Sequence, residues 1–239
     1  MVIAMAETVR VLSYNVRSLR DDRAALARVV RGCEPDVVCV QESPRFFGWR
    51  RAARAMAAEF GLSVVIGGAD ASGNLLLAAE RVRVAAKETL YLRHRRGLHL
   101  RGMALAALTV GRSRFTVAST HLSLDGAQRQ DQAEEVLGRL QDFAEREQAP
   151  ARVLCGDFNS HPDSVEWGAL TARMADAWQV APAGEEYTST ARDPYQRLDA
   201  VFVSDDVEVV RAGVPTDLVA QADMAVASDH RPVLAVLTV

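Results

Sequence analysis

The sequence predicts a mixed α/β fold in which two packed, mostly antiparallel β-sheets are covered by helices on their outer faces. Three observations support this prediction. Strand and helix patterns alternate near both ends of the chain, a run of strands fills the middle, and no linker or internal repeat divides the 239 residues. Regular alternation of strand and helix would instead favour one doubly wound parallel sheet. We therefore expect a single domain over residues 1–239.

The composition is that of an ordinary globular protein, with 49% hydrophobic and 25% charged residues. No apolar run reaches the roughly 18 residues of a membrane span. Residues 1–7 lack the basic-then-apolar layout of a secretory signal, so we expect a cytoplasmic protein, monomeric by default. The net charge of −3 provides no general attraction to nucleic acid, although a local basic patch could still bind it.

The three cysteines have no paired spacing, which argues against a disulfide framework or a zinc site. Cys39 and Cys155 stand inside apolar runs and are expected to be small buried side chains.

The first half of the chain alternates between strands and amphipathic helices. The predicted strands are rich in apolar and β-branched residues and cover 9–14, 36–40, 62–66 and 75–79. Helices are expected over 21–31 and over 49–60, where apolar residues recur at helical spacing. Asp21 and Asp22 suit the positive N-terminus of the first helix, and Gly61 ends the second.

The second half contains most of the strands. They are expected over 82–92, 103–110, 115–120, 151–155, 198–203, 207–214 and 233–239. The clearest helical stripe runs from Ala133 to Ala144, and a short helix is expected over 164–173. Gly156 is interpreted as the exit turn of the strand before it.

Polar side chains that can carry chemistry stand at the edges of six of these strands. Some follow strand ends, namely Asn15, Glu42, His121, and Asp157 with Asn159. Others precede strands, namely Asp199 and the pair Asp229-His230. Strand ends are where open sheets gather ligand sites, and the start of one strand can lie beside the end of another. All of these residues can therefore share one rim.

Each residue also has a plainer interpretation. Asp157 and Asn159 could form an Asx turn, and Asp229-His230 could be a turn before a strand. Glu42 could be a solvated strand end, and His121 a core histidine. The recurrence of the arrangement at six strand edges favours a shared site.

The chemistry of this set is that of carboxylates, carboxamides and imidazoles, without a serine or cysteine in an activating context. Such a set suits hydrolysis by a metal-bound or metal-positioned water. Oxygen ligands select Mg²⁺ or Mn²⁺ rather than zinc. A phosphate ester is the best-fitting substrate, because a dication and hydrogen-bond donors would stabilise its transition state.

The motifs, in this order, resemble the endonuclease/exonuclease/phosphatase superfamily. They are Asn15, Gln41-Glu42, Ser119-Thr120-His121-Leu122, Gly156-Asp157-Phe158-Asn159, Arg197-Leu198-Asp199 and Ser228-Asp229-His230-Arg231-Pro232. The resemblance extends over residues 9–239. It implies a four-layer α/β sandwich and divalent-metal-dependent hydrolysis of phosphate esters.

The resemblance also implies a metal site. Glu42 would be the main Mg²⁺ or Mn²⁺ ligand, helped by Asn15 and Asp229. If a second ion binds, Asp157 and Asn159 would coordinate it. One-metal and two-metal versions both stay open.

Roles around the phosphate follow from the same resemblance. Asp157 would orient or deprotonate the attacking water, with Asn159 beside it. His230 would contact the scissile phosphate, in a tautomer set by Asp199, and His121 would donate to a phosphate oxygen. Either Asp157 or His230 could be the general base.

The substrate is narrowed by departures from individual branches of the superfamily. Relatives that repair abasic sites carry a tyrosine where this chain has His121 and an aspartate where it has Arg17, which argues against that activity. Gly73-Asn74 matches part of a mid-chain motif of the superfamily, so the resemblance implies that Asn74 contacts the phosphate. A histidine at the position of His121 is instead typical of the deoxyribonuclease, sphingomyelinase and inositol-phosphatase branches.

A basic segment, Arg93–Arg101, holds four arginines and two histidines in nine residues. It is either a phosphate-facing arm for nucleic acid or an anionic headgroup, or a solvated hairpin. Arg101 is expected to point inward, toward the substrate. A phosphodiester is the favoured substrate and a phosphomonoester the alternative. A non-catalytic binding protein is disfavoured because Glu42, Asp157 and His230 are all present.

Overall fold

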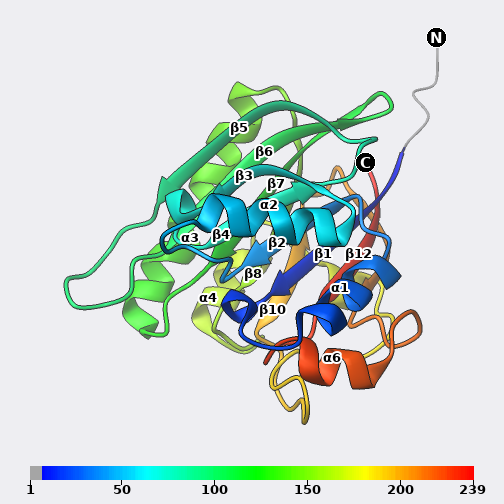
Figure 1. The fold of residues 1–239 in the computed structure, drawn as a ribbon. Helices are drawn as coiled ribbons and strands as arrows, with labels where there is room; N and C mark the ends of the chain where they lie inside the picture. Colours follow the sequence, from blue (N-terminus) through cyan, green and yellow to red (C-terminus); the bar gives the residue numbers. More distant parts are fainter. Residues whose placement is uncertain (1–6) are drawn as a thin grey trace.

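Two six-stranded β-sheets pack face to face, and helices cover the outer face of each (Figure 1). The structure, a computed structural model, describes residues 7–239. Residues 1–6, most of the segment in which we expect no secretory signal, lie outside the described part. The predicted four-layer sandwich is confirmed.

The first sheet has the strand order β11-β12-β1-β2-β4-β3. In that order its strands are Glu208–Gly213, Val233–Thr238, Thr8–Asn15, Val37–Gln41, Asn74–Ala78 and Ser63–Gly68. The second sheet has the order β5-β6-β7-β8-β10-β9. In that order its strands are Arg83–Tyr91, Gly102–Val110, Ser113–His121, Ala151–Asp157, Asp199–Val203 and Ala175–Asp176.

Most neighbouring strands are antiparallel, and each sheet contains one parallel pair among the described residues. These pairs are β1 with β2 and β7 with β8. In both, a helix returns the chain to the same edge, as parallel strands require. The carboxyl ends of the paired strands consequently lie side by side.

The helices divide between the two outer faces. α1 (Arg23–Gly32), α2 (Trp49–Phe60) and α6 (Gln221–Ala227) pack on the first sheet, and α3 (Gly126–Arg146) and α4 (Val165–Thr171) on the second. Their ends follow from local chemistry: the Asp22 carboxylate accepts hydrogen bonds from the first backbone amides of α1, and Gly61 ends α2 with φ 76°. None of these helices has the length and apolarity needed to cross a membrane.

The largest core cluster lies between the sheets. In β1, Val9 and Val11 face this central core, whereas Leu12 and Tyr14 face the helices. Cys39 and Cys155 belong to the central cluster and all three cysteines are free, as expected. Strands buried on both faces explain why their sequences are continuous apolar runs.

One local prediction is wrong. Gly156 is not an exit turn: β8 continues through it to Asp157, and Gly156 pairs with Thr120 on one side and Ala200 on the other. A Cβ at this position would lie 2.6 Å from the Thr120 carbonyl oxygen. The glycine is required by the close approach of two backbones.

Several short elements were not anticipated from the sequence. Among them are β9, α5 (Ala177–Val180) and α6, together with the 3-10 helices Arg17–Leu19 and Ala69–Ala71. Segments this short carry too few residues for a periodic pattern.

Candidate active site

The strand ends predicted to share a rim do meet. Asn15 ends β1, while His121 ends β7 directly opposite Asp157 at the end of β8. Asp199 opens β10 and is the antiparallel partner of Asp157. The Asn15 amide donates to Oδ2 of Asp157 over 3.0 Å, so the site bridges the two sheets.

Asp157 lies at the centre of this rim and is buried. Its Oδ2 is 3.4 Å from Nε2 of His121 and 3.8 Å from Nε2 of His230. Its Oδ1 accepts a hydrogen bond of 3.0 Å from the backbone amide of Asn159. The Asx turn offered as the plainer interpretation therefore exists, and it fixes the carboxylate between two imidazoles.

His230 is held by Asp199, with Nδ1 2.7 Å from a carboxylate oxygen. Burial alone would lower the pKa of the ring, but the carboxylates of Asp199, Asp157 and Asp229 together raise it to about 10. The protonated ring directs Nδ1–H at Asp199 and Nε2–H at Asp157. Thr188, which sequence reasoning missed, accepts from the Asp199 backbone amide at 3.2 Å.

His121, unlike His230, is held in its neutral form. Burial lowers its pKa to about 3, and Arg101 and His230 add to this effect against the attraction of Asp157. Its Nε2 lies 2.9 Å from the Asn159 amide nitrogen. A donor role for Nε2 requires the other tautomer, with the Asn159 amide turned to present its oxygen. That role stays a prediction.

The predicted metal ligands lie at the same rim. The Asn15 amide also donates to Oε1 of Glu42 over 3.3 Å, so it stands between Glu42 and Asp157. The Ser228 hydroxyl donates to the Asn15 carbonyl oxygen at 2.7 Å, which ties the segment carrying Asp229 to the end of β1. The Asp229 carboxylate lies 3.1 Å from Nε of Arg17, a cation that any metal ion there would have to displace or tolerate.

A second group has ligand spacing that the sequence did not single out as a set. Single ligand atoms of Asp157, Asp199 and His230 lie within 4.8 Å of one another. Nδ1 of His230 is already hydrogen-bonded to Asp199, so Nε2, which faces Asp157, is the ring nitrogen left to bind an ion here. Oxygen donors at Asn15 and Glu42 suit a hard cation better.

Arg101 points inward, as expected. It is 8% exposed, and its Nε has no hydrogen-bond partner among the described residues. Burial lowers the pKa of the guanidinium, while Asp157 and Glu42 raise it. A buried cation beside two site carboxylates, with an open donor, is a suitable anion ligand.

Asn74 is buried beside Arg101. Both of its amide hydrogens go to backbone carbonyls, of Ala71 and Gly102, at 2.9 Å each. It thus fixes the backbone next to Arg101. Its direct contact with phosphate stays a prediction.

The rest of the Arg93–Arg101 segment is a mostly exposed loop between β5 and β6. A different basic stretch was missed. Residues 45–54, just after Glu42, read RFFGWRRAAR, and Arg45 contributes to lowering the pKa of both His121 and Arg101. The alternation of arginine with aromatic residues was the available signal.

A buried carboxylate thus lies between two histidines at the joined strand ends of a four-layer sandwich, an arrangement that suits acid–base chemistry. A family model described as "Endonuclease/Exonuclease/phosphatase family" matches residues 12–230. The chain therefore belongs to this family, which confirms the resemblance and supports phosphoester hydrolysis.

Solved structures share the fold. The endonuclease/exonuclease/phosphatase protein of Bacteroides vulgatus is 21% identical with a TM-score of 0.81, covering 97% of this chain and 98% of its own. The mannosyl-6-phosphatase of Bacteroides thetaiotaomicron is 18% identical with a TM-score of 0.81, covering 96% and 99%. TDP2 of D. rerio, complexed with a single-strand DNA product, is 19% identical with a TM-score of 0.72, covering 98% and 100%. No curated protein sequence matches the chain.

Proposed function

We propose that this protein is a divalent-metal-dependent hydrolase that cleaves a phosphodiester by attack of water. The observation that carries the proposal is the position of Asp157 between His121 and His230, at 3.4 and 3.8 Å. A phosphate bound among these three groups would have a carboxylate to orient a water and nitrogen donors to meet its oxygens.

Each residue then has a role. Asp157 orients or deprotonates the attacking water, and Asn159 holds this carboxylate through its backbone amide. His230 contacts the scissile phosphate, and Asp199 is a positioning residue that sets its tautomer. His121 and Arg101 contact phosphate oxygens, and Asn74 supports Arg101.

Glu42, Asn15 and Asp229 fit a hard cation, Mg²⁺ or Mn²⁺. Glu42 and Asp229 supply carboxylate oxygens, whereas Asn15 would bind an ion only after its amide turns, because its nitrogen faces Glu42 and its Oδ1 accepts from the Arg17 backbone amide. Among the described residues the Glu42 carboxylate accepts only the 3.3 Å hydrogen bond from Asn15, which leaves it available. A bound dication would polarise the phosphate oxygens and offset their charge.

The diester is favoured because two separate hollows are lined by segments that follow site residues in the chain. One is lined by residues 45–51 and Arg54, downstream of Glu42. The other, downstream of Asn159, is lined by residues that include His161, Tyr187 and Tyr195. A diester carries an organic group on each side of phosphorus. TDP2, a relative in fold, is complexed with a single-strand DNA product.

A phosphomonoester is the second candidate, because the structural neighbour from Bacteroides thetaiotaomicron is a mannosyl-6-phosphatase. A cytoplasmic location and a monomeric state remain our expectations for this chain.

The test compares bis(p-nitrophenyl) phosphate with p-nitrophenyl phosphate in the presence of Mg²⁺ or Mn²⁺. We expect the diester to be cleaved, and Asp157→Ala and His230→Ala each to lower kcat by about 10²–10⁴. Activity that survives EDTA, or either substitution, would overturn the mechanism. Hydrolysis of the monoester alone would favour the second candidate.

A further inference from the structure

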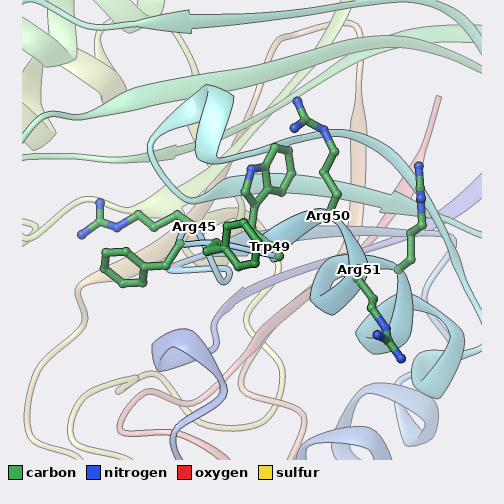
Figure 2. Close-up of a pocket in the computed structure, with 8 residues that line it drawn as sticks. Arg45, Trp49, Arg50 and Arg51 are labelled. Atoms are coloured by element: carbon green, nitrogen blue, oxygen red, sulfur yellow. The ribbon is translucent and has the colours of Figure 1, made fainter.

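Two phenylalanines in the loop between β2 and α2 are exposed to an unusual degree. Phe46 is 73% exposed and Phe47 108%. They line a surface hollow of about 690 Å³ together with Arg45, Gly48, Trp49, Arg50, Arg51 and Arg54 (Figure 2). We call residues 45–54 the arginine–aromatic surface. Adjacent aromatic side chains left in solvent mark an interaction site more often than a structural need.

Trp49 forms a fixed part of this surface. A Cβ on Gly68 would lie 2.2 Å from the indole ring, so the ring packs directly on the Gly68 backbone. The guanidinium of Arg50 lies over the same indole, 4.3 Å from the ring centroid, and reaches Asp70 at 3.0 Å. Figure 2 shows Arg45 and Arg50 on either side of Trp49. The hollow therefore has a rigid, planar wall.

The surface is strongly basic within an acidic protein. Of its four arginines only Arg50 has a salt bridge among residues 7–239. Arg45, Arg51 and Arg54 are exposed cations without a paired carboxylate in that range, against a net charge of −3 for the chain. A local excess of charge of this kind attracts polyanions independently of the net charge.

The surface also adjoins the catalytic rim. Arg45 stands three residues after Glu42 and lowers the pKa of both His121 and Arg101 by its charge. Its Nη1 lies 3.5 Å from the Ser72 carbonyl oxygen, just before β4, the strand that begins at Asn74. A polymer whose phosphate sits at Asp157 can continue onto residues 45–54.

We propose that the arginine–aromatic surface binds single-stranded nucleic acid on one side of the scissile phosphate. Phe46 and Phe47 stack on unpaired bases, and Arg45, Arg51 and Arg54 meet the backbone phosphates. A duplex would keep its base faces hidden from both rings. This inference rests on the proposed phosphodiesterase function.

A lipid surface is the competing partner, because exposed phenylalanines beside arginines can also enter a membrane interface. Charge and position favour nucleic acid. The two exposed rings share their hollow with Arg45, Arg51 and Arg54, and Arg45 stands three residues after Glu42, so a polymer bound at the catalytic rim can continue onto this surface.

The test measures binding of a fluorescent single-stranded oligonucleotide by anisotropy in EDTA, where affinity is read without turnover. We compare the wild-type protein with F46A/F47A, F46L/F47L and R51E/R54E. The matched control is R83E/R112E, which reverses two exposed arginines near the opposite ends of the strands from the site. Each variant is checked for its unfolding midpoint in urea.

We expect F46A/F47A and F46L/F47L to bind about fivefold or more weakly, since leucine cannot stack on a base. R51E/R54E should also flatten the slope of log K against log salt, by about 0.7 per lost phosphate contact. R83E/R112E should match wild type. Equal affinity in all folded variants would overturn the inference.

Two further measurements separate the alternatives. Vesicles containing anionic phosphatidylglycerol that bind wild type and F46L/F47L, but not F46A/F47A, would overturn the inference in favour of lipid. Cleavage of bis(p-nitrophenyl) phosphate by wild type tests the proposed function alone. If wild type binds the oligonucleotide but does not cleave bis(p-nitrophenyl) phosphate, the proposed phosphodiesterase function is overturned and the inferred binding surface is retained.

Discussion

The Nδ1 atom of His230 and a carboxylate oxygen of Asp199 lie 2.7 Å apart, although 31 positions separate them in the chain. Asp199 opens β10, and its antiparallel pairing with Asp157 brings both carboxylates to the two sides of one imidazole. The pair holds His230 in one orientation and stabilises its protonated form. Its consequences can be measured.

Replacing Asp199 with asparagine should lower kcat by about 10²–10⁴ while leaving the fold intact, because the side chain keeps its shape but no longer holds the protonated His230 ring with its charge. NMR titration of the His230 ring nitrogens should show a lower pKa than in wild type. Asp206→Asn, in an exposed position beyond the other end of β10, is the matched control. Full activity of Asp199→Asn would contradict the positioning role.

Replacing Glu42 with glutamine should weaken binding of the metal ion, because it removes the charged oxygen ligand and keeps the volume. We expect the Mg²⁺ concentration for half-maximal activity to rise about tenfold or more, and Mn²⁺ binding measured by equilibrium dialysis to weaken in parallel. Glu80→Gln, at an exposed turn between β4 and β5, is the control. Unchanged Mn²⁺ binding in Glu42→Gln would exclude this residue as the main ligand.

The buried His121 should make the protein less stable in acid. Its pKa falls from 6.5 to about 3 on folding, so the unfolded chain binds a proton at this ring over that range and the folded protein does not. The stability contribution is complete above pH 6.5 and decreases as the pH falls toward 3.

The urea midpoint of wild type should therefore decrease more steeply below pH 6.5 than that of His121→Gln. His161→Gln, an exposed histidine, should follow the wild-type curve. Parallel curves for wild type and His121→Gln would mean that the ring is not buried in its neutral form.

Gly156→Ala should destabilise the protein by about 1–3 kcal/mol, because its Cβ would lie 2.6 Å from the Thr120 carbonyl oxygen, a backbone atom that cannot move aside. Gly138→Ala is the informative comparison. Gly138 lies inside α3 with open space around its Cα, so alanine there should stabilise by roughly 0.5–1 kcal/mol. Both free energies come from urea unfolding. A neutral Gly156→Ala would contradict the close approach of β7 and β8.

The strand ends were predictable because each is marked by a local change from apolar to polar residues. Asn15, His121 and Asp157 were placed at strand ends from that change alone, and the structure has them there. The contacts among them were not predictable. The link between Arg17 and Asp229, and the support of Asp199 by Thr188, join loops with no pattern that relates one to the other.

The wrong prediction at Gly156 also arose because contacts between neighbouring strands leave no local pattern in the sequence. A glycine before polar residues is typical of a turn, yet here it lies within a strand because Thr120 on the neighbouring strand leaves no room for a Cβ. Which neighbour a strand has is a property of the sheet order. The arginine–aromatic surface was missed for a related reason: an amphipathic helix over 49–60 explained its residues without regard to the exposed face.

The sequence by itself determined that apolar strands end in carboxylates, amides and imidazoles, and hence the family and the class of chemistry. It could do so because burial and strand ends leave local signals in residue type. Only the tertiary structure decided that His121 is neutral and His230 protonated. The state of each ring depends on how deeply it is buried and on how many carboxylates the two sheets bring beside it.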